Sequence, residues 1–457
     1  MKRLLLFVLA FTLATAISYG EQNEKYLKDY VQIGLKNNLE LKGSREGLKA
    51  YDARLGQAIA GYLPRAELTS RYTRAGGGRS FVFPLGQMMN PLYEIAGLST
   101  RFKDENVPFM RPEEQDTKLE IIQPVFNMAI WHNIEAQDKQ IDFGKYEYQA
   151  KELATVYNIK EAYYNYAKAM QLVSIRKYAE TLVRENYETA KKLYNVDKVP
   201  KTDVLRAEVA LSQMTQELQT ATNNLKLAGN VFNNFLNQES NTPILFDSVS
   251  VENISNSSNI EALKTKMQID EALNLAITTR PEISQMEKSI ETIQSAKSAI
   301  SSDYYPSLAV VFDYGVQGEK YKFDKDADYW MLSGVFKWNL FTGLETKNKV
   351  QEIEAQASAL QYTKESTKKL IKLDVMNNYL SLQSAFEQLE TARKSYAASA
   401  ENYDLNKKRY AEGLNSFISL LDAETTLNSS KEFYIITYYE ILTAKAKLEK
   451  SMGLAIY

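Results

Sequence analysis

Two very long stretches without helix-breaking residues restrict the fold of this chain more than any other feature. Residues 129–194 contain no proline and one glycine, Gly144, and residues 344–410 contain neither. A continuous helix of this length would extend roughly 100 Å, at about 1.5 Å per residue. Apolar and small side chains recur along both stretches at spacings of three and four residues, as in coiled coils. We therefore predict long coiled-coil helices, which taken alone are equally compatible with a soluble antiparallel coiled coil.

The sequence of the second half repeats features of the first half. The triplet Glu185-Asn186-Tyr187 recurs as Glu401-Asn402-Tyr403, which is 216 positions later (185 to 401). The same offset relates Lys191-Lys192 to Lys407-Lys408, Leu205 to Leu421, and Ala207-Glu208 to Ala423-Glu424. Agreement in order and spacing over several elements indicates an internal duplication. Each half is expected to contain a short helix, two strands and two long helices.

The expected elements can be given as residue ranges. The first repeat covers residues 21–237, with strands at 63–73 and 117–127 and long helices at 129–194 and 202–237. The second covers 266–457, with strands at 306–316 and 328–340 and long helices at 344–410 and 416–452. Residues 238–265, rich in Asn and Ser, are expected to link the repeats. Residues 74–116, rich in Gly and Pro, are expected to form an external hairpin loop.

The four predicted strands alternate in polarity. In the third strand, Leu308, Val310, Phe312 and Tyr314 share one face, opposite Ser307, Ala309 and Asp313. Each run is about nine to eleven residues long, the length that a tilted strand needs to cross a bilayer. A soluble hairpin sheet with one dry face is the alternative.

Membrane strands would require several copies of the chain. Four strands cannot close a membrane barrel, because the smallest barrels have about eight and open sheet edges are not tolerated in lipid. Three copies would supply about twelve strands and leave room for a channel. The strands therefore favour a homotrimer, on the condition that they lie in a membrane.

The N-terminus and the composition place the chain outside the cytoplasm. Residues 1–20 have the basic start, short apolar core and small residues of a cleaved secretory signal. There are no cysteines, which excludes disulfides, thiolate metal sites and cysteine nucleophiles. The formal net charge of −2 gives no support to nucleic-acid binding. His132 is the only histidine, and no enzyme or cofactor signature is present. We expect neither catalysis nor a cofactor or metal.

Two short segments carry a resemblance to a known family. The second half contains Arg409-Tyr410-Ala411-Glu412-Gly413 followed by Ser419-Leu420-Leu421-Asp422-Ala423-Glu424, and the first half contains Leu193-Tyr194-Asn195 followed by Thr202-Asp203-Val204-Leu205-Arg206-Ala207-Glu208. Together with Pro64 and Pro306 before the first strand of each half, these segments resemble the TolC family of outer-membrane efflux proteins. The resemblance covers essentially the whole mature chain.

The resemblance implies a mainly α protein with membrane β-structure. Three chains would form a twelve-stranded barrel in the bacterial outer membrane and a coiled-coil tunnel through the periplasm. The implied function is a passive gated conduit of a multicomponent efflux or type I secretion system. Its implied partners are a periplasmic adaptor, an inner-membrane transporter and outer-membrane lipid. The alternative is a periplasmic coiled-coil adaptor or structural envelope protein without a pore.

The resemblance also implies roles for residues at the helical tips. Asp422 matches an acidic residue that lines the family's periplasmic constriction, and Ser419 stands where some members carry a second aspartate. Asp203 matches a first-copy aspartate that helps to hold the closed state. Its expected basic partner falls near Asn415, so neutral hydrogen bonds or Lys201 would replace an ion pair. The expected adaptor contacts are Val199, Pro200, Gly413 and Leu414.

A ring of three Asp422 carboxylates would attract cations, because like charges held close together create a negative potential. Spacing alone favours the interpretation of Asp422 as a solvated or first-turn helix residue, and the family resemblance makes the two interpretations about equal. By the same reasoning, Asp203 is a residue at the N-terminus of a helix.

Overall fold

The computed structural model describes residues 25–99, 101–246, 267–320 and 327–455. The predicted signal at 1–20 lies outside these residues, as does most of the predicted linker at 238–265. The chain divides into two compact units. One comprises Met1–Tyr51, Gln140–Ile290 and Ala359–Tyr457, and the other Asp52–Lys139 and Glu291–Ser358. None of the helices in the described ranges combines the length and the apolar character needed to cross a membrane.

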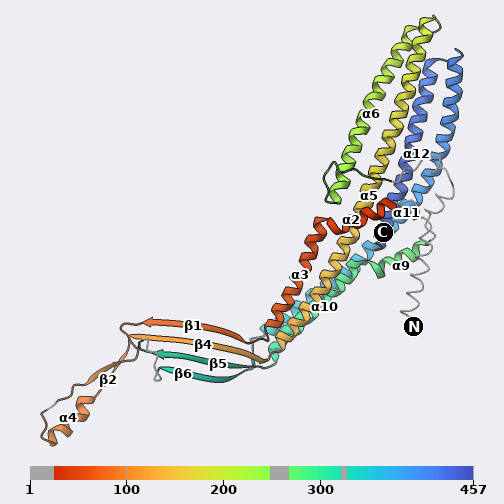
Figure 1. The fold of residues 1–457 in the computed structure, drawn as a ribbon. Helices are drawn as coiled ribbons and strands as arrows, with labels where there is room; N and C mark the ends of the chain where they lie inside the picture. The colour runs from red at the N-terminus through yellow and green to blue at the C-terminus, as the bar shows by residue number, and fades with distance from the viewer. Residues whose placement is uncertain (1–24, 100, 247–266, 321–326, 456–457) are drawn as a thin grey trace. The chain divides into compact units, whose positions relative to one another are not determined.

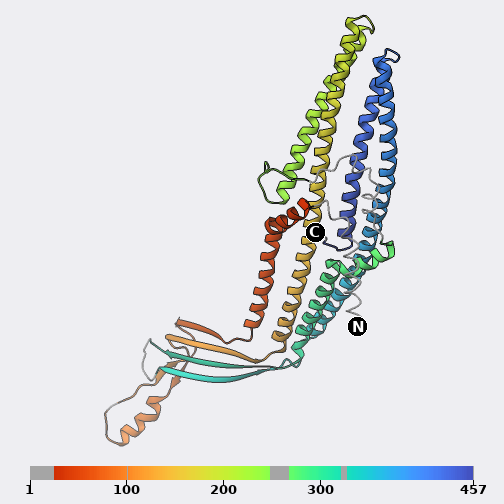
Figure 2. The same ribbon diagram turned by 45° about the vertical axis from the view of Figure 1, so that its right-hand side comes forward.

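Two helical hairpins dominate the first unit. The first hairpin joins α5 (Met128–Asn195) to α6 (Lys201–Phe235), and the second joins α11 (Glu345–Ala411) to α12 (Phe417–Ser451). Figures 1 and 2 show the two hairpins running side by side, with their turns at the same end. The mainly helical fold class predicted from the breaker-free stretches is therefore confirmed.

Each repeat places two helices before its first strand, where the sequence predicted one short helix. These are α2 (Lys25–Asn37) and α3 (Leu39–Ala60), and α9 (Ile269–Thr279) and α10 (Pro281–Ser301). The first break is stabilised by Asn38, whose side chain accepts a hydrogen bond from Leu41 N at 3.1 Å and donates to Phe235 O at 3.2 Å. The second break falls at Arg280, because a residue before proline favours extended backbone over helix.

The core of the first unit lies between these helices. Its fully buried side chains include Ile159 on α5, Phe232 on α6 and Tyr434 on α12. Gly144, the one glycine of the first long stretch, is where α3 approaches α5. A Cβ at this position would lie 2.6 Å from the ring of Tyr51. This glycine therefore permits close helix packing and does not interrupt the helix.

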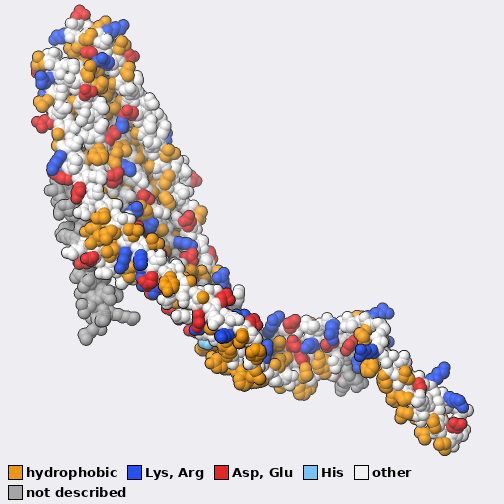
Figure 3. Space-filling view, turned by 180° about the vertical axis from the view of Figure 1, so that it is seen from behind, with side chains coloured by type: hydrophobic (Ala, Val, Ile, Leu, Met, Phe, Trp, Pro, Cys, Tyr) orange, Lys and Arg blue, Asp and Glu red, His pale blue; other side chains and the backbone are white. Residues whose placement is uncertain are grey.

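The second unit contains a four-stranded antiparallel sheet in the order β1-β4-β5-β6. Its strands are β1 (Arg65–Arg74), β4 (Glu113–Phe126), β5 (Ser307–Gly318) and β6 (Asp328–Lys337). The register aligns the apolar positions of all four strands on one face, for example Leu68 with Leu119, Leu119 with Tyr314, and Tyr314 with Trp330. Large apolar side chains of this face are exposed, and apolar side chains gather along the sheet in Figure 3.

Two strand boundaries differ by more than two residues from those predicted. β4 begins at Glu113 and not at 117, because its first residues pair with the end of β1, as in Glu113 with Arg74. β6 ends at Lys337 and not at 340. The next residue, Trp338, instead donates its indole N–H to Tyr304 O at 3.1 Å. β1 and β6 each have a neighbour on one side only, so both edges of the sheet are open.

Residues 74–116 contain a folded insertion where the sequence predicted a hairpin loop. A second, two-stranded sheet joins β2 (Ser80–Phe83) to β3 (Glu105–Pro108), and α4 (Leu85–Ile95) lies between these strands in the chain. Asp104 accepts a hydrogen bond from Gly86 N at 2.9 Å, and Asn90 exchanges two hydrogen bonds with the backbone of Phe102. Alternation and helical spacing do not reveal elements this short.

Candidate functional site: the tips of the helical hairpins

The two hairpin turns have the same backbone structure. Asp197 N donates to Tyr194 O at 3.0 Å and Lys198 N to Leu193 O at 2.9 Å. In the second hairpin, Gly413 N donates to Tyr410 O and Leu414 N to Arg409 O, both at 2.9 Å. Both are Schellman-type helix ends, with left-handed backbone at Asp197 (φ 57°) and Gly413 (φ 75°). The turns lie 216 positions apart (197 to 413), so the sequence repeat is preserved in the geometry of the tips.

The helices that leave the turns begin differently. α12 begins after Ser416, whose side chain accepts a hydrogen bond from Ser419 N at 3.2 Å. α6 begins after Pro200, which provides no side-chain cap, and Asp203 lies in its first turn. A carboxylate in the first turn interacts favourably with the exposed N–H groups of the helix, which compensates in part for the missing cap.

The predicted gate residues lie at these tips, and among the described residues no hydrogen bond or ion pair joins one of them to another. Asp422 is exposed and is the sixth residue of α12, so it belongs to the second turn and not to the first. Asp203 and Lys201 form no ion pair among the described residues. Asn415 makes its side-chain hydrogen bonds within its own hairpin, donating to Asn406 Oδ1 and accepting from Ser416 N. Among the described residues of one chain, no hydrogen bond or ion pair links the Asp203 side chain to Lys201 or Asn415.

The predicted adaptor contacts flank the two turns. Leu414 is 66% exposed, Gly413 and Pro200 are also exposed, and Val199 is half-buried. The structure therefore presents these residues at the ends of the hairpins, where a partner can reach them.

A buried polar pair joins the two hairpins below the turns. Asn186 on α5 donates from Nδ2 to Glu424 Oε2 on α12 at 2.7 Å, and both side chains are buried. The second oxygen, Glu424 Oε1, has no hydrogen-bond partner in the described part of the chain. Burial raises the pKa of Glu424 to about 7, although the Asn186 amide and the Lys407 ammonium act in the opposite direction. Around this pair pack Tyr403, Tyr410 and other members of a small apolar cluster.

Sequence reasoning used Glu424 and Asn186 only as markers of the repeat and did not assign them to the site. A signal was nevertheless present. Glu424 lies four residues after Leu420 and three before Leu427, and Asn186 lies four after Leu182 and four before Ala190. Each polar residue therefore interrupts an apolar helical stripe, a position at which burial is expected.

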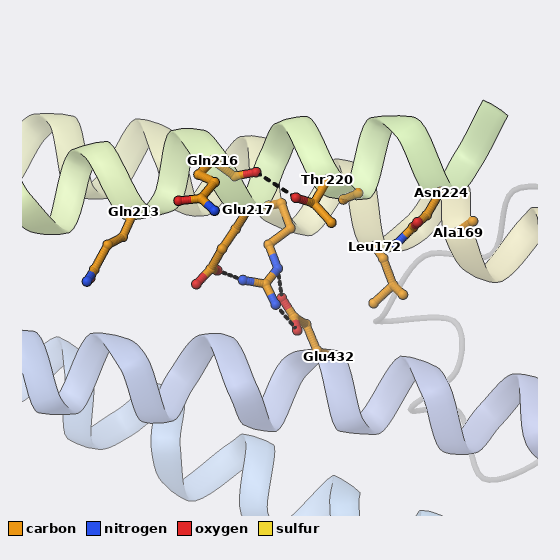
Figure 4. Close-up of a pocket in the computed structure, with 10 residues that line it drawn as sticks. Ala169, Leu172, Gln213, Gln216, Glu217, Thr220, Asn224 and Glu432 are labelled. Carbon is orange, nitrogen blue, oxygen red and sulfur yellow. Dashed lines mark hydrogen bonds and ion pairs between the residues drawn. The ribbon is translucent and has the colours of Figure 1, made fainter. Parts of the chain in front are cut away.

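A groove of about 510 Å³ lies further from the tips, between α5, α6 and α12. Arg176 of α5 forms ion pairs with Glu217 on α6 and with Glu432 on α12, the two carboxylates labelled in Figure 4. Arg176 Nη2 donates to Glu432 Oε2 at 2.7 Å. Burial raises the pKa of Glu432, an effect that the Arg176 charge opposes. Ion pairs of this kind hold helices in register and show no catalytic arrangement. Within the described residues, no cluster of three or more His, Asp or Glu side chains could hold a metal ion.

Comparison with known proteins identifies the class. The family model described as outer membrane efflux protein matches residues 31–236 and 272–454. The outer membrane protein TolC of Escherichia coli (strain K12) is 20% identical, over 99% of this chain and 87% of its own length.

Solved structures share the fold. A CusC structure, described as undergoing transmembrane channel formation, has a TM-score of 0.76 at 14% identity, over 94% of this chain and 93% of its own. The outer membrane protein VceC of Vibrio cholerae has a TM-score of 0.74 at 15% identity, over 96% of this chain and 98% of its own.

The chain belongs to the outer membrane efflux protein family. It is accordingly an efflux channel protein of the outer membrane and not an enzyme. The family resemblance predicted from the tip sequences is confirmed, and the conduit reading fits better than a periplasmic adaptor without a pore.

Proposed function

We propose that three copies of this chain form a passive conduit in the outer membrane, gated at its periplasmic helical tips. The observation that carries this proposal is the sheet. It has an exposed apolar face across all four strands and an open edge at both β1 and β6. Such a sheet is stable in lipid only if its edges are paired, and pairing β6 of one copy with β1 of the next would do this. Three copies would supply about twelve strands, enough to enclose a channel.

The working partners we propose are a periplasmic adaptor and an inner-membrane transporter. The exposed turns that contain Pro200, Gly413 and Leu414 are suited to adaptor contact, because they project from the ends of rigid hairpins. A passive channel has no energy source of its own, so directed export would depend on the transporter.

The gate we propose includes Asp422, with Ser419 one turn before it and Asp203 on the first hairpin. Asp422 is exposed and has no ion-pair partner among the described residues, so its charge is free to act on a passing ion. Three copies around one axis would produce a negative ring at the narrow end of the tunnel. Since Ser419 and Asn415 are neutral, the closed state would depend on hydrogen bonds more than on ion pairs.

Single-channel conductance in planar bilayers tests this function, with the trimer mass checked in detergent. We expect small, discrete, cation-preferring openings from the wild-type trimer. Asp422→Asn should reduce the preference for cations several-fold, whereas Glu412→Asn, at an exposed position in the turn, should change it little. A monomer that never inserts would refute the conduit. Unchanged selectivity in a folded Asp422→Asn trimer would refute the acidic ring alone.

A further inference from the structure

The two hairpins are equivalent in detail at their tips. Besides the matching turns, Lys191 lies over the ring of Tyr187 at 5.7 Å, and Lys407 lies over the ring of Tyr403 at 5.9 Å. Both members of the second pair are 216 positions after those of the first. Residues related by this offset therefore occupy equivalent places, and a contact made by one hairpin can be transferred to the other.

Near the tips, two polar contacts join the first hairpin to the second within one chain. Asn186 donates to Glu424 at 2.7 Å, and Glu185 lies 3.6 Å from Lys407 Nζ. In both contacts, a residue of α5 meets a residue of the second hairpin. These contacts define one side of the first hairpin and the facing side of the second.

The duplication has retained the residue types of all four positions of these contacts in the other hairpin. Asn402 and Glu401 correspond to Asn186 and Glu185, and Glu208 and Lys191 correspond to Glu424 and Lys407. All four of these counterparts are exposed in the single chain. Within the described part of the chain, the exposed Asn and Glu of the second hairpin have no equivalent of the Asn186–Glu424 and Glu185–Lys407 contacts, and the first hairpin presents the matching Glu and Lys.

We propose that the second hairpin of one copy packs against the first hairpin of the next copy through the same contacts. This places Asn402 against Glu208 of the next copy, and Glu401 against Lys191 of the next copy. The proposal rests on the proposed trimer and specifies its contact surfaces at the tips. A head-to-tail interface of this kind uses two different surfaces per chain and closes into a ring when the rotation fits.

Charge and hydrogen-bonding capacity support a second copy of this chain as the occupant. The pairing brings Lys191 beside Glu401 and supplies an amide donor for the Glu208 carboxylate, as the intrachain interface does for Glu424. The equivalence holds only near the tips. The positions that correspond to Arg176 and Glu432 are Ala392 and Gln216, so the ion pair lining the groove has no intersubunit counterpart.

The absence of cysteine from this chain permits a direct test. The variant Glu208→Cys/Asn402→Cys is treated in outer-membrane vesicles with a short bis-maleimide cross-linker. We expect covalent dimers and trimers in at least half of the protein, and at most traces from either single variant. The matched control is Asn186→Cys/Glu424→Cys, which should cross-link within one chain and yield no covalent oligomer.

The outcomes distinguish this proposal from the proposed function. A trimer by mass in detergent that gives no intersubunit cross-link would overturn the proposed contacts and leave the trimer intact. A wild-type chain that is monomeric by mass would overturn the trimer itself. If the double cysteine variant does not assemble, charge-reversal variants test the proposed contact by their effect on the stability of the trimer. Lys191→Glu and Glu401→Lys should each weaken the trimer several-fold, and the combination should restore it. Failure of the combination to restore the trimer would refute the pairing.

Discussion

The two hairpin tips share the same backbone structure but differ in which residues form the turn and in which side chains are buried. Both turns have a left-handed residue, but the first uses Asp197 and the second Gly413. Both carry a Glu at the same distance beyond the turn, yet within a single chain Glu424 is buried against the other hairpin while Glu208 is exposed. The difference shows that burial and charge state depend on which neighbour a helix face meets, even when the local sequence is duplicated.

The largest expected difference between the two tips is the pH dependence of their stability, which Glu424 causes. Because the pKa of Glu424 is raised to about 7, the folded tip binds a proton more tightly than the unfolded chain does. Stability is therefore greatest below the unfolded pKa of about 4.5, falls as pH rises, and reaches its low plateau above pH 7. The full loss corresponds to roughly 3 kcal/mol.

Native-state hydrogen exchange of α12 amides, corrected for intrinsic rates, measures this loss as a local opening free energy. Glu424→Gln keeps the shape without the ionisation and should flatten the pH profile. Glu208→Gln serves as the matched substitution at the equivalent position and should leave the steep dependence in α12 in place. A wild-type profile that is already flat from pH 5 to 8 would argue against burial of the carboxyl.

Removal of the amide partner should have a somewhat smaller effect. Asn186→Leu leaves the Glu424 carboxyl buried without its hydrogen-bond donor, at a cost of about 2 kcal/mol at pH 8. The same exchange measurement on α12 reports this cost. Asn195→Leu, at the exposed end of the same helix, should cost less than about 0.5 kcal/mol. Similar effects from the two substitutions would contradict the role of Asn186.

Substitutions at the left-handed residues of the two turns should have the smallest effects on stability. Gly413→Ala places a side chain on left-handed backbone (φ 75°) and should destabilise the hairpin by about 1 kcal/mol. Asp197→Gly relieves the corresponding strain in the first turn (φ 57°) and should stabilise it by a few tenths of a kcal/mol. Thermal unfolding followed by circular dichroism compares the two variants. Changes of the same sign would show that the two turns do not share their backbone geometry.

Much of the fold follows from local patterns. Three-four spacing without breakers predicted the helices of both hairpins, because such a pattern buries one face wherever the helix packs. Alternation predicted the common apolar face of the four strands, since side chains in a strand point to opposite sides in turn. The elements β2, α4 and β3 were not predicted. They depend on hydrogen bonds between specific side chains and backbone groups, such as Asn90 with Phe102.

At the candidate site, too, some residues were found from the sequence and others only from the structure. The tip sequences located Asp203, Asp422 and the turn residues, but the ion-pair role considered for Lys201 has no counterpart in the single chain. The link between Asn186 and Glu424 was missed, because two residues 238 positions apart come together only when the hairpins pack.

The sequence by itself therefore determined the helices, the strand faces, the duplication and the family, all of which rest on regular spacing or on residue identity along the chain. Only the tertiary structure decided which of two equivalent glutamates is buried and which asparagine contacts it. Packing between distant segments sets the solvent exposure and the hydrogen-bond partner of each carboxyl, and these in turn set its pKa.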